Sequence, residues 1–201
     1  MGRARTFDDQ DILERATRLF WRNGYNGTSM RQLVDITGLA KASLYNAFGN
    51  KQDIFHSVLK YYIDTKQTQS LALLAQGRTG RQALEAYFAN IVRVTAQNSP
   101  TPGCLLVNTA AEQGPHQASM RDIVDRGIKR TERHLANTVQ RGIEDGSINP
   151  GADPELAGFC LTTMLLGIRV LARKGVDIEK VRSLIKANLD AHAPGIVKQH
   201  S

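Results

Sequence analysis

Apolar residues recur at helical spacing along almost the whole chain. Ile12, Ala16, Leu19 and Phe20 stand at positions i, i+4, i+7 and i+8, which places them on one face of an amphipathic helix. The same spacing returns in later segments, and no segment shows strand-like alternation of convincing length. The hydrophobic pattern therefore predicts an all-α fold.

Glycine, proline and capping residues divide this pattern into about nine helices. Gly38 suits the tight turn between a second and a third short helix, and Gly77 and Gly80 mark a break after the fourth. We expect a helix-turn-helix domain of three helices over residues 1–50. A fourth helix over 51–76 connects it to a larger helical domain over 77–201.

The third short helix carries a compact set of groups that suit a DNA groove. Ala42 is small enough to permit close approach, Ser43 and Tyr45 offer hydroxyl groups to phosphates, and Lys41 can reach guanine acceptors or a phosphate, with Asn46 as a further polar group of the set. This combination predicts the recognition helix of a helix-turn-helix element that binds duplex DNA.

Helix starts on either side supply further candidates for phosphate contacts. Thr28 and Ser29 open the second helix, and Lys51 opens the fourth, where backbone N–H groups are also available. Each residue taken singly also fits an ordinary cap or a solvated helix face. Their joint spacing favours DNA binding.

Charge and composition agree with this interpretation without deciding it. The net charge of +7 and the pI of about 9.6 suit a polyanionic partner. The two cysteines show no metal-ligand spacing, so we expect no cofactor and no metal. The N-terminus lacks the apolar core of a signal peptide, and residues 159–171 are too interrupted by polar residues for a membrane span. A cytoplasmic protein without a membrane contact is expected.

Residues 8–58 resemble the N-terminal domain of the tetracycline-repressor (TetR) family of transcriptional regulators. The matching positions include the Gly24-Tyr25 pair, Thr28, the Thr37-Gly38 turn, Lys41 to Phe48 and Lys51 to Phe55. The resemblance implies an all-helical homodimer with a small DNA-binding domain and a larger effector-binding domain. It also implies that Thr28, Ser43, Tyr45 and Lys51 contact phosphate, and that Lys41, Ala42 and Asn46 lie nearest the bases. Arg3 and Arg5 form a basic arm that suits a minor groove, although a disordered tail fits equally well.

The larger domain should hold a site for a small-molecule effector of unknown identity. The segment from Pro102 to Asn108 resembles one found in a subset of the family, at the start of a helix that touches the DNA-binding domain. Cys104 follows Pro-Gly, at the start of that helix, where the helix dipole can make a thiol reactive. We expect Cys104 either to sense an electrophile or oxidant or to be a small core residue. Candidate pocket residues, which fit the core equally well, are Phe88, Ile91, Val107, Ile128 and Met164.

The last two helices are candidates for the dimer interface. Their apolar stripes are Ala157, Leu161, Leu165 and Ile168 on the eighth helix and Ile178, Val181, Ile185 and Leu189 on the ninth. The alternative is that these faces close the core of the monomer.

The combined interpretation is a ligand-responsive transcriptional repressor that is not an enzyme. It should bind a near-palindromic operator as a homodimer and be released by a small molecule or by thiol modification. Two other classes remain as alternatives. One is an enzyme with Cys104 as nucleophile and His116 or His134 as base. The other is a ligand-independent architectural DNA binder.

Overall fold

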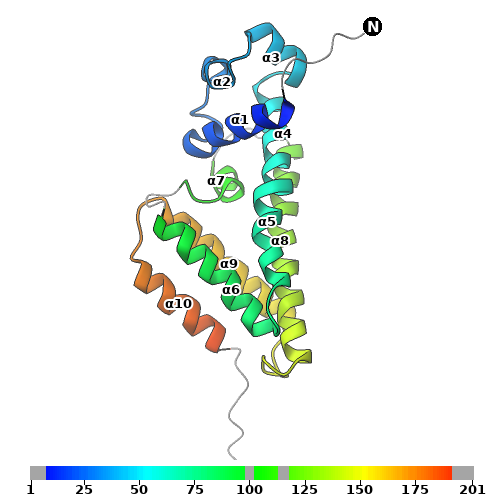
Figure 1. Cartoon of the computed structure of the whole chain (residues 1–201), viewed down its shortest axis with the longest axis vertical. Coiled ribbons are helices and arrows are strands. Elements are labelled where there is room, and N and C mark those ends of the chain that lie inside the picture. Colours follow the sequence, from blue (N-terminus) through cyan, green and yellow to red (C-terminus); the bar gives the residue numbers. More distant parts are fainter. Residues whose placement is uncertain (1–7, 98–101, 113–117, 192–201) are drawn as a thin grey trace, which may run out of the picture. The chain divides into compact units, whose positions relative to one another are not determined.

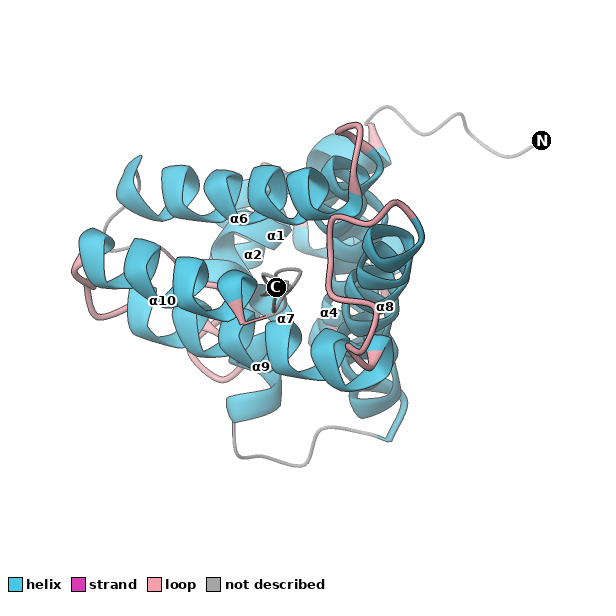
Figure 2. Cartoon of the chain, turned by 90° about the horizontal axis from the view of Figure 1, so that it is seen from below, coloured by secondary structure: helices cyan, strands magenta, loops and turns pink. Residues whose placement is uncertain are grey.

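The computed structural model describes residues 8–97, 102–112 and 118–191, and this part of the chain is helical without any strand (Figure 2). The elements are α1 (Asp9–Asn23), α2 (Met30–Thr37), α3 (Lys41–Phe48), α4 (Lys51–Tyr62), a π turn at Ile63–Gln67, α5 (Thr68–Leu71), a 3₁₀ turn at Ala72–Ala75, α6 (Gly80–Gln97), α7 (Leu105–Ala111), α8 (Ala118–Glu144), α9 (Pro154–Ala172) and α10 (Ile178–Asp190). If the continuous run from Lys51 to Ala75 counts as one helix, the described part forms nine helices. The predicted all-α fold is confirmed.

The chain divides into two compact units, and each is discontinuous in sequence. The first unit comprises Met1–Gln67 and Pro102–Asp125, and the second comprises Thr68–Thr101 and Arg126–Ser201. This division differs from the boundaries expected at residues 50 and 77. The reason is that α7, far along the sequence, packs on α1 and α4 and so joins the first unit.

The first unit is built around the helices that the sequence assigned to the helix-turn-helix element (Figure 1). Its core holds fully buried side chains from α1, α2, α3 and α4, namely Phe20, Leu33, Leu44 and Phe55. Gly38 adopts the left-handed conformation, with φ of 70°, that the turn between α2 and α3 requires. A side chain there would be strained, so this glycine sets the angle at which α3 leaves α2.

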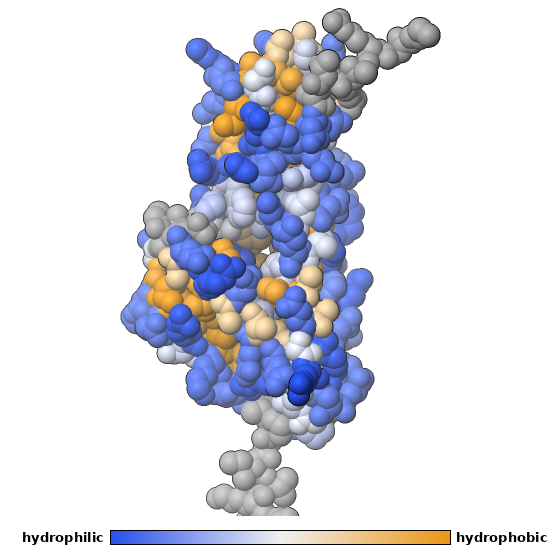
Figure 3. Space-filling view, in the orientation of Figure 1, coloured by the Kyte–Doolittle hydropathy of each residue, from blue (hydrophilic) through white to orange (hydrophobic). Residues whose placement is uncertain are grey.

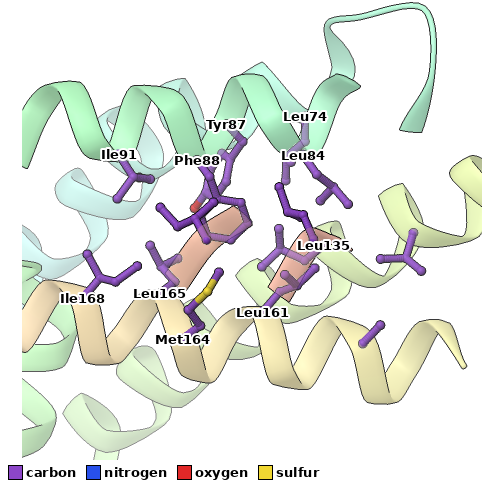
Figure 4. Packing of buried hydrophobic residues seen from close by; sticks show 14 of the residues in the cluster. Leu74, Leu84, Tyr87, Phe88, Ile91, Leu135, Leu161, Met164, Leu165 and Ile168 are labelled. Atoms are coloured by element: carbon purple, nitrogen blue, oxygen red, sulfur yellow. The ribbon is translucent and has the colours of Figure 1, made fainter. Parts of the chain in front are cut away.

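The second unit packs α6, α8, α9 and α10 around one apolar cluster. Figure 4 shows α6 contributing Leu84, Phe88 and Ile91 from one side while α9 contributes Leu161, Met164, Leu165 and Ile168 from the other. Burying these side chains drives the association of the helices, because apolar area is removed from water.

Two further contacts hold helices of the second unit together. One is a close backbone approach between α8 and α9, and the other is made by Arg81 between α6 and α10. A Cβ atom on Gly158 would lie 2.7 Å from the Cβ of Ala136, so α9 meets α8 where only glycine fits. Arg81 at the start of α6 donates to the carbonyl of Leu189 and to Asp190, each at 2.7 Å, which joins α6 to the end of α10.

Helix α9 is the one described helix whose length and apolarity equal those of a membrane span. Its inner side packs in the core of the second unit through Ala157, Leu161, Leu165 and Ile168. Its high hydropathy therefore reflects a core helix that also carries apolar side chains on its outer side.

Candidate nucleic-acid interface

Helix α3 buries one apolar side chain in the first unit and exposes mostly polar residues on its outer side. Leu44 is fully buried in the first unit, whereas Lys41, Ala42, Tyr45 and Asn46 are exposed. Because Leu44 faces the core, the opposite side of the helix faces solvent. The structure thus exposes four of the residues that the sequence predicted to contact DNA.

Two side chains of α3 also interact with each other. The ammonium group of Lys41 lies 5.9 Å from the centroid of the Tyr45 ring, within the range of a cation–π contact. The Tyr45 side chain remains 39% exposed. Ser43, the remaining predicted phosphate contact on α3, is half-buried. Both side chains are therefore at least partly accessible to solvent.

At the start of α2, the two predicted residues have different surroundings. Ser29 is exposed and forms a capping box with Gln32, in which its hydroxyl accepts the Gln32 N–H at 3.2 Å. Thr28 is only 1% exposed, and its hydroxyl donates to the carbonyl of Gly24 at 2.7 Å. The Thr28 hydroxyl thus bonds within the turn in the protein without DNA, and its contact with phosphate stays a prediction.

The start of α4 is capped, and Lys51 beside it is held against an aromatic ring. The side-chain oxygen of Asn50 accepts the N–H groups of Gln52 and Asp53, at 2.8 and 3.2 Å. The Lys51 ammonium lies 4.3 Å from the centroid of the Tyr25 ring. Burial lowers the pKa of Lys51 below its ordinary value, and the nearby charge of Glu112 opposes part of that change. Lys51 is thus pre-positioned by residues that lie outside α4.

Glu112 is the residue of this region that sequence reasoning missed. It ends α7, and its two carboxylate oxygens accept the backbone N–H of Tyr25 at 3.0 and 2.9 Å. No local pattern could have found it, because the two residues are 87 positions apart. The structure shows why position 24 is a glycine, since a Cβ at that position would collide with the Glu112 carboxylate.

The predicted effector residues separate between the two units. Phe88, Ile91 and Met164 are buried in the apolar cluster of the second unit, and Ile128 is half-buried on α8 in the same unit. Cys104 and Val107 belong to the first unit. The alternative of plain core packing therefore describes the first three residues.

Cys104 lies half-buried immediately before α7. It occupies the N-cap position without forming a side-chain capping bond. The hydroxyl of Tyr62, near the end of α4, donates to its Sγ atom at 3.6 Å. Cys104 thus lies where α7 meets α4, inside the same unit as the recognition helix.

The apolar stripes predicted for dimerisation point into the subunit. Ala157, Leu161, Leu165, Ile168, Val181, Ile185 and Leu189 are buried in the core cluster, and Ile178 packs half-buried against it. This is the monomer-core alternative, so those side chains are not available to a partner. The exposed apolar residues of α9 and α10 are instead Leu156, Phe159, Val170, Leu171 and Leu184.

The remaining chemical candidates do not converge on a site within the described residues. No group of three or more His, Cys, Asp or Glu side chains gathers there as it would around a metal. Cys104 and His134, a proposed nucleophile and base, belong to different units. His116, Arg3 and Arg5 lie outside the described residues.

Comparison with known proteins identifies this arrangement. A family model described as "Bacterial regulatory proteins, tetR family" matches residues 12–58, and one described as "Tetracyclin repressor-like, C-terminal domain" matches residues 80–187. The chain belongs to the TetR family. It is therefore a transcriptional regulator with a helix-turn-helix domain, and the enzyme alternative is excluded because its relatives are DNA-binding regulators.

Individual TetR-family relatives match over nearly the whole chain. The transcriptional repressor ComR of Escherichia coli K12 is 29% identical over 189 residues, covering 94% of this chain and 90% of ComR. The structure of a cysteine mutant of the regulator CifR, complexed with double-stranded operator DNA, is 27% identical with a TM-score of 0.82. That match covers 94% of this chain and 99% of that one. The reduced form of E. coli NemR, 21% identical with a TM-score of 0.85, covers 94% and 100% and shares the fold.

Proposed function

We propose that this TetR-family regulator is a cytoplasmic repressor that binds a near-palindromic operator as a homodimer. The observation that carries the proposal is the exposed face of α3, where Lys41, Ala42, Tyr45 and Asn46 surround the buried anchor Leu44. Two copies of such a helix, spaced by about 34–36 Å, would enter successive major grooves. Lys41, Ala42 and Asn46 would read bases, while Ser43, Tyr45 and Lys51 would contact phosphates, with Ser29 beside them.

Selection of bound DNA from a random pool tests this proposal directly. The expected product is a palindrome bound with an affinity that falls linearly with the logarithm of salt concentration. Replacing Asn46 by Ala should relax the preference at one position of each half-site. Replacing Lys51 by Met should instead weaken binding to all sequences alike and reduce the salt slope by about 1 per half-site. A protein that recovers no preferred sequence at physiological salt contradicts the proposal.

The exposed apolar residues of α9 and α10 supply the proposed dimer interface. Leu156, Phe159, Val170 and Leu171 lie on the outer side of α9, and Thr163 and Gly167 between them are exposed and small. Figure 3 shows hydrophobic side chains reaching the surface of the second unit over the region of α10, where Leu184 is exposed. Exposed patches of this kind mark protein-contact surfaces, and small residues permit close helix approach.

Modification of Cys104 is the proposed release signal. The thiolate would add to the β-carbon of an α,β-unsaturated carbonyl compound, and a proton from water would complete the adduct at the α-carbon. The added group must then fit where Tyr62 and α7 now lie against Sγ. Operator release by N-ethylmaleimide should be lost in a Cys104→Ser variant and kept in a Cys160→Ser variant. Equal release from both variants would exclude Cys104.

A reversible effector has a separate candidate site in the second unit. A groove of about 330 Å³ between α5, the following 3₁₀ turn and α8 is lined by Leu71 and Leu74 together with Arg130, His134 and Arg141. Its apolar floor and basic wall suit a small organic carboxylate. The predicted pocket residues Phe88, Ile91, Val107, Ile128 and Met164 do not line it. Benzoate should weaken operator binding in the wild type but not in an Arg130→Gln variant, with benzamide as the neutral control.

A further inference from the structure

Helix α7 carries Cys104 at one end and Glu112 at the other. Cys104 is its N-cap and Glu112 its C-cap, with seven helical residues between them. At 1.5 Å per residue the helix is about 10 Å long, so the two side chains lie on one short rigid element. The helix packs on both α1 and α4. A displacement forced at the Cys104 end therefore moves the Glu112 end as well.

The Glu112 end holds the turn between α1 and α2. Both carboxylate oxygens accept the backbone N–H of Tyr25, and this is a charge-assisted bond that links residues 87 positions apart. Gly24 directly precedes it with φ of 74°, and a Cβ there would collide with the carboxylate. The turn thus has the one residue type that allows an anion to approach its backbone this closely.

The same turn positions a proposed phosphate contact. The Tyr25 ring lies 5.0 Å from that of Phe55 on α4, and the Lys51 ammonium lies 4.3 Å from the Tyr25 centroid. The charge of Glu112 also acts on Lys51 directly. Glu112 therefore holds Tyr25 through a backbone bond, and Tyr25 in turn holds Lys51 through its ring.

We propose that Glu112 is a positioning residue for operator binding and that it transmits the state of Cys104 to the DNA-binding helices. While Glu112 bonds Tyr25, the α1–α2 turn and Lys51 keep the geometry that suits phosphate. A bulky group on Cys104 displaces α7, breaks the Glu112–Tyr25 bonds and lowers operator affinity. This inference rests on the proposed operator binding and adds the element that connects the thiol to it.

The operator affinity of a Glu112→Ala variant distinguishes the positioning role of Glu112 from the plain effect of its negative charge on DNA binding. Removing a negative charge from a DNA-binding protein should by itself tighten binding or leave it unchanged, because fewer charges repel the phosphates. Loss of the clamp should instead weaken binding about 10-fold, because a smaller fraction of the protein holds the competent geometry. Glu155→Ala, an exposed residue in the second unit, removes the same charge and is the matched control.

A Glu112→Gln variant preserves the test if Glu112→Ala disturbs folding. Its side-chain oxygen can still accept the Tyr25 N–H, but without the negative charge, so operator binding should lie between those of wild type and Glu112→Ala. Affinity equal to or tighter than that of Glu155→Ala, in both Glu112 variants, would overturn the positioning role.

Hydrogen exchange of the Tyr25 amide, measured by NMR without DNA, gives an independent readout. Exchange should be slow in the wild type, at least several-fold faster in Glu112→Ala, and similarly faster after N-ethylmaleimide reacts with Cys104 in a Cys160→Ser background. An unchanged Tyr25 exchange rate after complete modification of Cys104 would overturn the transmission. A wild-type protein that binds no specific DNA would defeat the proposed function, while this exchange measurement would still decide the link between Cys104 and Tyr25.

Discussion

Replacement of Phe159 by Ala tests whether the outer side of α9 forms the dimer interface. Phe159 is 56% exposed in the subunit. For a side chain of about 200 Å², that fraction leaves about 110 Å² to be buried by a partner, or about 2.7 kcal/mol at 25 cal/mol per Å². Alanine retains part of this burial, so the loss is about 2 kcal/mol per subunit. In a two-fold symmetric dimer the substitution occurs in both subunits, so the free energy of dimerisation is weakened by about 4 kcal/mol. This loss raises the dimer dissociation constant about 10³-fold.

Sedimentation equilibrium over a concentration series measures this constant directly. The variant should dissociate at protein concentrations where the wild type remains dimeric, and the full palindrome should lose its affinity advantage over a half-site. Thermal unfolding of the dissociated monomer should change little, because the removed side chain is largely exposed. Ala86→Glu, on the exposed side of α6, is a surface control. A dissociation constant within about threefold of the wild-type value would refute the assignment of this face.

Further outcomes follow from individual side chains. Phe88→Ala, which empties a fully buried position facing Met164, should cost about 3–5 kcal/mol and lower Tm by roughly 10 °C in calorimetry, whereas a smaller cost would indicate an open pocket. Thr28→Val should destabilise the first unit by about 1–3 kcal/mol, because the Gly24 carbonyl loses its donor, while the salt slope of operator binding stays unchanged. Burial raises the pKa of Glu14, but the Tyr61 hydrogen bond and the Lys66 charge outweigh it and hold the pKa below the ordinary value of a glutamate. The stability that Glu14 contributes is therefore complete above that value and lost as the pH falls through the folded pKa. Urea titrations between about pH 6 and pH 3 should show a steeper loss for the wild type than for Glu14→Gln.

Local features of the first unit were predictable because neighbouring residues determine them. The Ser29–Gln32 capping box, the left-handed Gly38 and the Asn50 cap of α4 each depend on residues within four positions of one another. The exposed face of α3 likewise depends on the spacing of Leu44 from its polar neighbours. Such features can be read from the sequence because helix capping and helical periodicity act over a single turn.

Choices between two faces of one helix were not predictable in the same way. The stripe from Ala157 to Ile168 and the opposite stripe from Leu156 to Leu171 are both apolar, and periodicity alone does not say which one a core will cover. The partners of α9 in the fold, α6 and α8, decide it. The partner of the Thr28 hydroxyl was likewise not predictable from the sequence. A hydroxyl at a helix start can bond either a phosphate or a carbonyl four residues earlier.

The amino-acid sequence by itself determined the helical class, the helix boundaries and the exposed polar face of α3, because each arises from short-range spacing along the chain. Only the tertiary structure decided which unit α7 joins, which side of α9 is buried, and that Glu112 meets the Tyr25 backbone 87 residues away. Such contacts form when the chain collapses around shared apolar cores. Their partners depend on packing in three dimensions and leave almost no trace in local sequence.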